Sequence, residues 1–105
     1  RYTDMLEAFK LLKVDEIHLE HCSLHYSMLE IFNEWQFAGS ISAGVIDQRI
    51  DNIETISEIE NTTKPLLKYF TPNRILLTSE CGFGHVPLDI TRAKLGVLVE
   101  AAKKY

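Results

Sequence analysis

The sequence of 105 residues lacks the features of disulfide-rich, membrane and nucleic-acid-binding proteins. With only 2 cysteines and no CxxC pair, no disulfide framework is expected, and a cytoplasmic location is predicted. No apolar run approaches the length of a membrane span, and no signal peptide is visible. The net charge of -4 argues against a partner bound through phosphate contacts. We therefore expect neither a membrane nor a nucleic acid among its partners.

Apolar residues at helical spacing recur along the chain. They predict helices over residues 4–13, 26–36 and 88–104. A capping box of Thr55 and Glu58 opens a further helix, which Pro65 should kink or start afresh. Polar intervals separate these helices from segments of a different pattern.

Strand-like segments lie between the helices, at residues 16–20, 40–46 and 75–78. The resulting order αβαβαβα predicts parallel strands with right-handed crossovers, with the strand over 40–46 in the middle. Three parallel strands cannot close a barrel, and a complete (β/α)₈ barrel needs about 250 residues. The chain is therefore predicted to be either a small three-layer α/β sheet or the last βα units of a barrel, cut from a longer protein.

Polar side chains stand at the carboxyl end of each predicted strand: Glu20, then Asp47 to Arg49, then Cys81. Active sites of α/β sheets and barrels form at this edge. Carboxylate and thiolate groups are both zinc ligands, although the spacing alone is a weak signal because no compact metal motif is present. The alternative for Cys81 is a buried, inert thiol. The glycines on either side of Phe83 and the second polar strand end at Glu20 weigh against that alternative.

Histidine and the second cysteine add further candidates. His18 alternates with Glu20, so it is predicted to share the face of Glu20 and to point into the site. Cys22 follows closely and is a weaker candidate thiolate, because a side chain just past a strand end is poorly constrained. The remaining histidines lie in loops or at helix starts and are expected to be solvated or capping groups: His21, His25 and His85.

Several segments together resemble a known family. They are residues 15–20 (DEIHLE), 41–49 (ISAGVIDQR), 77–83 (LTSECGF) and 93–102 (AKLGVLVEAA). They are similar to the C-terminal part of cobalamin-independent methionine synthase, the 5-methyltetrahydropteroyltriglutamate–homocysteine methyltransferase, and of its shorter relatives. The resemblance covers essentially the whole chain.

The resemblance implies a (β/α)₈ barrel whose catalytic zinc is held by His, Cys, Glu and a second Cys. Glu20 matches the glutamate and Cys81 the second cysteine, while the His-x-Cys pair would lie upstream of residue 1. Asp47, Arg49 and His18 would line the same mouth and contact substrate or donor. The implied reaction is methyl transfer from a methylated folate, or a related donor, to the thiol of homocysteine, giving methionine.

Two departures from the family pattern bear on this reaction. Residues 78–80 read Thr-Ser-Glu where the family often has Asn-Pro-Asp. Arg49 stands where the longer enzymes carry a histidine thought to donate a proton, which a guanidinium cannot do at ordinary pH. A related barrel enzyme with other thiol or decarboxylase-type chemistry is therefore the alternative, and so is an inactive fragment that only self-associates. The 105-residue chain alone is expected to be inactive and oligomeric, because its barrel-facing side would be uncovered.

Overall fold

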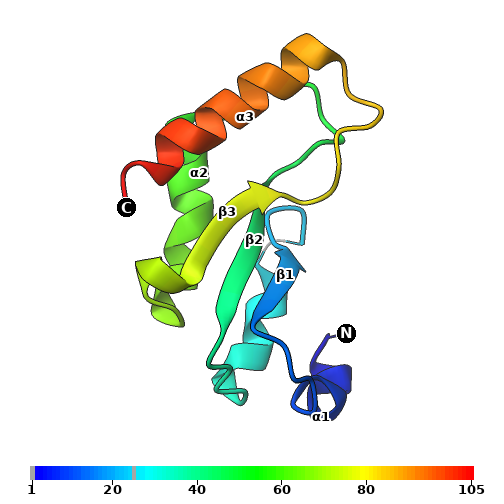
Figure 1. The fold of residues 1–105 in the computed structure, drawn as a ribbon, viewed down its shortest axis with the longest axis vertical. Helices are drawn as coiled ribbons and strands as arrows, with labels where there is room; N and C mark the ends of the chain where they lie inside the picture. Colours follow the sequence, from blue (N-terminus) through cyan, green and yellow to red (C-terminus); the bar gives the residue numbers. More distant parts are fainter. Residues whose placement is uncertain (1, 25) are drawn as a thin grey trace.

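A computed structural model describes residues 2–24 and 26–105, so His25 lies outside the described residues. Its centre is a parallel sheet of β1 (Glu16–Glu20), β2 (Ser40–Ile46) and β3 (Ile75–Ser79), in the order β1-β2-β3 (Figure 1). The predicted strands, their direction and their order are confirmed. Because the strands are parallel, all three carboxyl ends lie at one edge of the sheet.

The register separates the two faces of the sheet. One row across the strands contains His18, Ser42 and Leu76, and the next row on the same face contains Glu20, Gly44 and Thr78. The opposite face is apolar and supplies the core through Leu19, Ile41 and Ala43. On the first face His18, Glu20 and Leu76 are exposed, so this side of the sheet is open.

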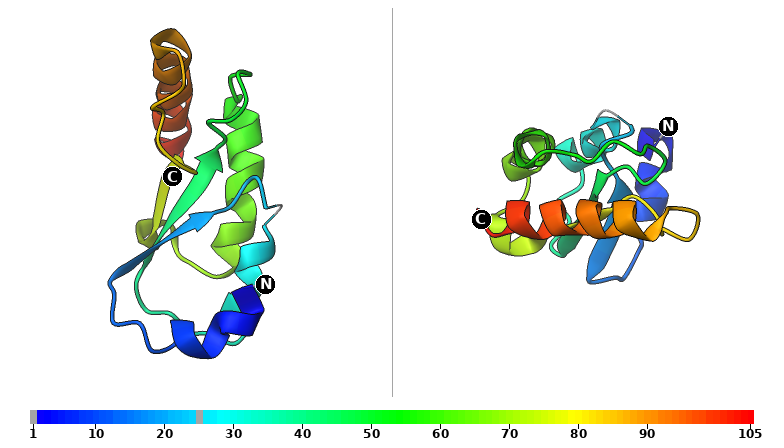
Figure 2. Two further views of the ribbon diagram at one scale, coloured as in Figure 1. Left: turned by 90° about the vertical axis from the view of Figure 1, so that its right-hand side faces the viewer. Right: turned by 90° about the horizontal axis from the view of Figure 1, so that it is seen from above.

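Two α-helices cover the apolar face. The first, α2 (Ile56–Thr63), is capped by Thr55, whose Oγ1 accepts from the backbone N–H of Glu58 at 3.1 Å. It passes into the 3₁₀ helix η3 (Lys64–Lys68), with Pro65 in the first turn, so the predicted break is confirmed. The second, α3 (Leu88–Ala102), runs from the loop after β3 back to α2 (Figure 1). Seen from above, α3 spans the width of the molecule (Figure 2).

Two predicted helices differ from expectation. The segment over 4–13 contains only the 3₁₀ helix η1 (Tyr2–Met5) and the short α1 (Leu6–Phe9), because Leu12 is exposed and gives the next turn nothing to pack on. The segment over 26–36 forms a 3₁₀ helix, η2 (Ser27–Asn33), preceded by Tyr26 in the left-handed region at φ 66. Burial of its apolar side chains, and not helix propensity, holds η2 in place.

The buried face of α3 includes one residue that the apolar pattern does not indicate. Ala93 is exposed, whereas Lys94 is fully buried beside Leu98 and Ala101. In η3, Leu67 is exposed, whereas its neighbour Leu66 is fully buried. Lys94 is buried through polar contacts, so a search for apolar residues at the 3.6-residue period does not identify it.

The overall shape is elongated. Its principal extents are 41 × 28 × 22 Å and its radius of gyration is 14.1 Å, above the ~13 Å expected of a compact domain of this length. None of the helices in residues 2–24 and 26–105 is both long enough and apolar enough to cross a membrane.

Candidate functional site

The residues predicted from the sequence stand at the carboxyl edge of the sheet. Glu20 is the last residue of β1, Asp47 directly follows β2, and Cys81 lies just after β3. Both Glu20 and Cys81 are exposed. The parallel topology therefore brings to one edge three groups that are far apart in the sequence.

Asp47 and Arg49 form a bidentate ion pair. Arg49 Nε donates to Asp47 Oδ1 at 3.0 Å and Nη2 donates to Oδ2 at 3.1 Å, while the Arg49 backbone N–H also donates to Oδ1 at 2.9 Å. The hydrogen bonds from Arg49 lower the pKa of the Asp47 carboxyl, and the same pairing raises the pKa of Arg49. Both side chains are therefore charged at neutral pH, and Arg49 cannot serve as a proton donor.

Glu80 connects all three strand ends, although no motif around it predicted it as a site residue. Its side chain is only 3% exposed. Its Oε2 accepts from the backbone N–H of Ser23 at 2.9 Å and from Ser23 Oγ at 2.8 Å, and its Oε1 lies 3.7 Å from Arg49 Nη2. The available signal was Gly44, since a glycine inside a strand often marks the close approach of another group.

Gly44 makes room for Glu80. A Cβ at position 44 would lie 2.7 Å from both Cα and Cγ of Glu80. The ladder is irregular between Gly44 and Ile46, and the backbone N–H of Glu80 donates to Ile46 O at 2.9 Å. This irregularity turns Glu80 over the middle strand towards the loops after β1 and β2.

His18 lies on the open face, as predicted, but the protein holds its ring. Nε2 is 3.0 Å from the carbonyl oxygen of Glu80, and Nδ1 is 3.3 Å from Ser42 Oγ. Because a carbonyl oxygen only accepts, Nε2 donates the hydrogen bond to Glu80 O. His18 thus links β1 to the backbone beside Cys81.

Cys22 is unsuited to a thiolate role in this arrangement. Burial, reinforced by the negative charge of Glu80, raises the pKa of the Cys22 thiol to about 12. In the metal-free chain, a thiol that stays protonated at neutral pH is a poor nucleophile. The lower ranking of Cys22 relative to Cys81 is consistent with this geometry.

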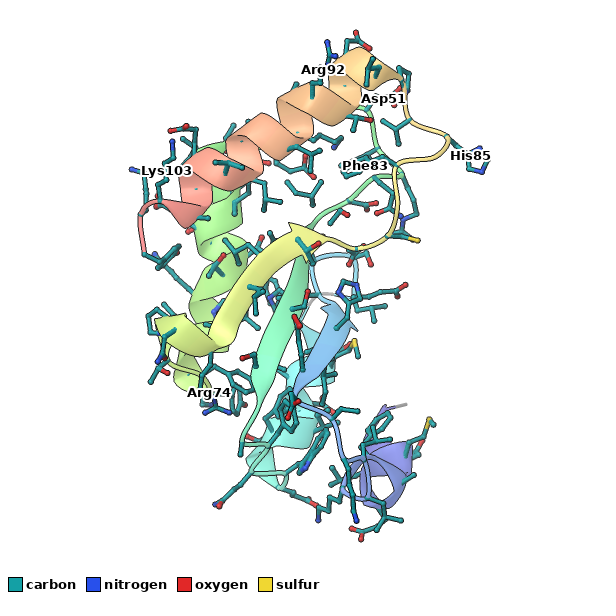
Figure 3. All side chains as sticks on the ribbon, viewed as in Figure 1. Asp51, Arg74, Phe83, His85, Arg92 and Lys103 are labelled. Atoms are coloured by element: carbon teal, nitrogen blue, oxygen red, sulfur yellow. The ribbon has the colours of Figure 1, made fainter. Side chains whose placement is uncertain are left out.

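The other described histidines differ in environment. His21 is fully buried, which contradicts the solvated alternative, while its ring contacts a carbonyl in the last turn of α2, as a capping group would. Its Nε2 donates to Thr62 O at 2.7 Å, and its Nδ1 has no hydrogen-bond partner among the described residues. Burial accordingly lowers the pKa of His21. His85 stands at the outer tip of the loop before α3 and points away from the sheet, as expected of a solvated group (Figure 3).

A buried ion pair lies beneath the loop that carries Asp47 and Arg49. Lys94 Nζ donates to Glu54 Oε1 at 2.7 Å, and the Lys94 side chain is 0% exposed. A lysine in an amphipathic helix ordinarily lies on the solvated face, so the sequence does not indicate this pair.

The donor chemistry at the edge fits half of a zinc site. A carboxylate and a thiol are suitable ligands, but a tetrahedral site needs four. Within residues 2–24 and 26–105, no group of three or more His, Cys, Asp or Glu side chains could hold a metal ion. The backbone of Cys81 is constrained on both sides, because its N–H donates to Gln48 Oε1 at 3.2 Å and its carbonyl accepts from Ser79 Oγ at 2.6 Å.

A cavity of about 390 Å³ lies between α2 and the loops after β1 and β2. It is lined by Cys22, Asp47, Arg49 and Glu54 among others, but by neither Glu20 nor Cys81. Its volume lies within the range of small-ligand sites. The edge therefore carries two zinc-type donors and a fixed ion pair, and the ion pair borders a cavity large enough for a small molecule.

Comparison with known proteins places this geometry in context. A family described as "Cobalamin-independent synthase, Catalytic domain" matches residues 1–104. A methionine synthase of Saccharolobus islandicus is 35% identical over 92 residues, which are 88% of this chain and 28% of that protein. The corresponding protein of Saccharolobus solfataricus is 29% identical over 102 residues, 97% of this chain and 31% of its own length.

A solved structure shares the arrangement of strands and helices. It is a B12-independent methionine synthase from a Shewanella species in complex with selenomethionine. It superposes with a TM-score of 0.83 at 26% identity, over 98% of this chain and 30% of that chain. The chain thus spans less than a third of the length of each of these relatives.

Proposed function

The chain belongs to the family of cobalamin-independent methionine synthase catalytic domains, as its motifs predicted, and we propose that it forms the last βα units of a (β/α)₈ barrel. The open face of the sheet supports this proposal. His18, Ser42 and Glu20 would point into the barrel, where polar side chains near the carboxyl edge serve the site. The remaining units would come from the part of the relatives that this chain does not span.

For the whole protein we infer methyl transfer from a methylated folate, or a related donor, to the thiol of homocysteine. Zinc, when bound, would keep that thiol deprotonated and nucleophilic at neutral pH. Glu20 and Cys81 would supply two of its ligands, and an upstream His-x-Cys pair the others. The observation that carries the inference is the parallel register that brings the ends of β1 and β3 to one edge beside β2.

Asp47, Arg49 and His18 would orient the substrate or donor. Asp47 uses only two of the five guanidinium N–H groups of Arg49, so others can bind an anionic group such as a carboxylate. Since Arg49 does not release its proton, its role would be to bind an anionic group of the substrate or donor and not to act as a general acid. This pairing is also the observation that favours the second candidate, a related barrel enzyme with other thiol or decarboxylase-type chemistry.

Cobalt substitution tests the metal assignment in the 105-residue chain. Co²⁺ occupies zinc sites and shows a thiolate-to-metal absorption when a cysteine binds it. We expect weak binding, because only two protein ligands are present, and loss of the absorption in Cys81→Ser. The matched control Cys22→Ser should retain it. An absorption that survives in Cys81→Ser would overturn the assignment.

Homocysteine then tests the substrate assignment. Added homocysteine should increase the thiolate-to-cobalt absorption, because it brings a second sulfur ligand, whereas homoserine, which has no thiol, should not. Glu20→Gln should weaken both the metal and the thiol response. Equal responses to homocysteine and homoserine would contradict thiol binding at this metal.

A further inference from the structure

We propose that the buried Lys94–Glu54 pair is a positioning device for the loop after β2, which carries Asp47, Gln48 and Arg49; this inference rests on the proposed function. The ammonium of Lys94 has three N–H donors, and all three are used. They donate to Asp47 O at 3.2 Å, to Asn52 O at 2.8 Å and to Glu54 Oε1 at 2.7 Å.

The second carboxylate oxygen of Glu54 closes a ring. Glu54 Oε2 accepts from the backbone N–H of Asp47 at 2.9 Å. Both backbone polar groups of Asp47 are therefore bound by the same ion pair, one by Glu54 and the other by Lys94. The start of the loop is therefore held by Lys94 of α3 and by Glu54, which lies just before α2.

The groups that this loop presents do not touch Lys94 directly. The Asp47 carboxylate holds the backbone and side chain of Arg49, and Gln48 Oε1 accepts from the N–H of Cys81 at 3.2 Å. A shift of the loop would therefore displace both the guanidinium and the contact to a proposed metal ligand. Lys94 and Glu54 would act on the site through Asp47 and Gln48, as positioning residues.

Stability alone is a poor explanation for the pair. Burying an ammonium is costly, and replacing a buried ion pair by apolar residues of similar size is often neutral or stabilising. What apolar residues cannot supply is the set of directed hydrogen bonds to the two polar groups of Asp47. The pair is thus better explained by the conformation it imposes on the loop than by the energy it contributes.

The deciding variant is the double substitution Lys94→Met/Glu54→Leu in the 105-residue chain, without metal or thiol. We expect it to unfold cooperatively near the wild-type temperature. Exchange of the Arg49 Nε–H and the Cys81 N–H with water, followed by NMR, should nevertheless become about tenfold faster, and the Arg49 Nε resonance should shift. The matched control is Lys103→Met/Glu100→Leu, which removes a surface pair of the same helix at 3.2 Å and should change neither.

A second variant keeps the test decisive if the double substitution prevents folding. Glu54→Gln retains the size of the side chain, but its amide has one acceptor oxygen for two donors, so the ring cannot close. The same acceleration at Arg49 is expected. Unchanged exchange and an unchanged Arg49 Nε resonance in a folded variant would overturn the proposal and leave the cobalt test unaffected. Conversely, failure of the cobalt test would not alter these NMR results.

Discussion

Replacing Gly44 with alanine should destabilise the chain because the new methyl group would collide with Glu80. The added Cβ would lie 2.7 Å from Cα and Cγ of Glu80 and 3.1 Å from its backbone nitrogen. Ordinary contacts between carbon atoms are roughly 3.5–4.0 Å, so about 1 Å of space is missing. Gly44 does not have a positive φ, so steric overlap and not backbone strain decides the outcome.

Two hydrogen bonds to its backbone hold Glu80 in place, so it cannot move away from the new methyl group without losing them. Its N–H donates to Ile46 O at 2.9 Å, and its carbonyl accepts from His18 at 3.0 Å. Overpacking of this kind destabilises the folded chain by about 1–3 kcal/mol. Alanine also lowers the conformational entropy of the unfolded chain, which stabilises the folded chain by about 0.4–1 kcal/mol. A net loss of about 1–2 kcal/mol corresponds to a melting temperature lowered by roughly 5–15 °C for a domain of this size.

Thermal unfolding followed by circular dichroism measures this effect. The matched controls are Gly82→Ala and Gly96→Ala, since a Cβ at either position meets nothing within 4 Å. Gly96 lies in α3, where alanine should stabilise by up to about 1 kcal/mol. A Gly44→Ala chain that melts at or above the wild-type temperature would show that Glu80 can move freely, and would refute its role as the link between the strand ends.

Four further experiments test other parts of the structure. At pH 8 a thiol reagent should modify exposed Cys81 and leave Cys22 intact, because the pKa of Cys22 is raised to about 12; two labels on the folded chain would contradict this. Burial lowers the pKa of His21 below 6.5, so the stability from its neutral form is complete above that pH and is lost as the pH falls from there towards the lowered pKa. His21→Gln should therefore flatten the dependence of stability on pH in this window. An unchanged slope would show that His21 is not the group responsible. Thr55→Ala should cost about 1 kcal/mol in urea unfolding by removing the cap of α2, whereas Thr55→Ser should not. Light scattering at low micromolar concentration should find an oligomer, since Leu76 on the open face is 47% exposed; a cooperatively melting monomer would defeat that expectation.

Local patterns were enough to predict the architecture. Alternation over residues 16–20 and apolar runs over 40–46 and 75–78 indicated the strands. Their separation by helices predicted parallel pairing, and the order found here is the one expected if strand order follows the sequence. The cap at Thr55 and the break at Pro65 are likewise properties of a few adjacent residues. Because the carboxyl ends of parallel strands share an edge, the positions of Glu20, Asp47 and Cys81 at that edge followed from the same reasoning.

The contacts within the site depended on residues that are distant in the sequence. Nothing in the neighbourhood of Glu80 shows that it will be buried against Gly44 and bonded to Ser23, since that contact requires all three strands to be assembled. In the same way, Lys94 resembles a solvated helix residue until the loop after β2 brings three oxygen acceptors to its ammonium. The sequence by itself determined which groups stand at the edge of the sheet. The tertiary structure decided which of them are buried, paired and held in place, because burial and pairing are set by long-range packing and not by the local period of the chain.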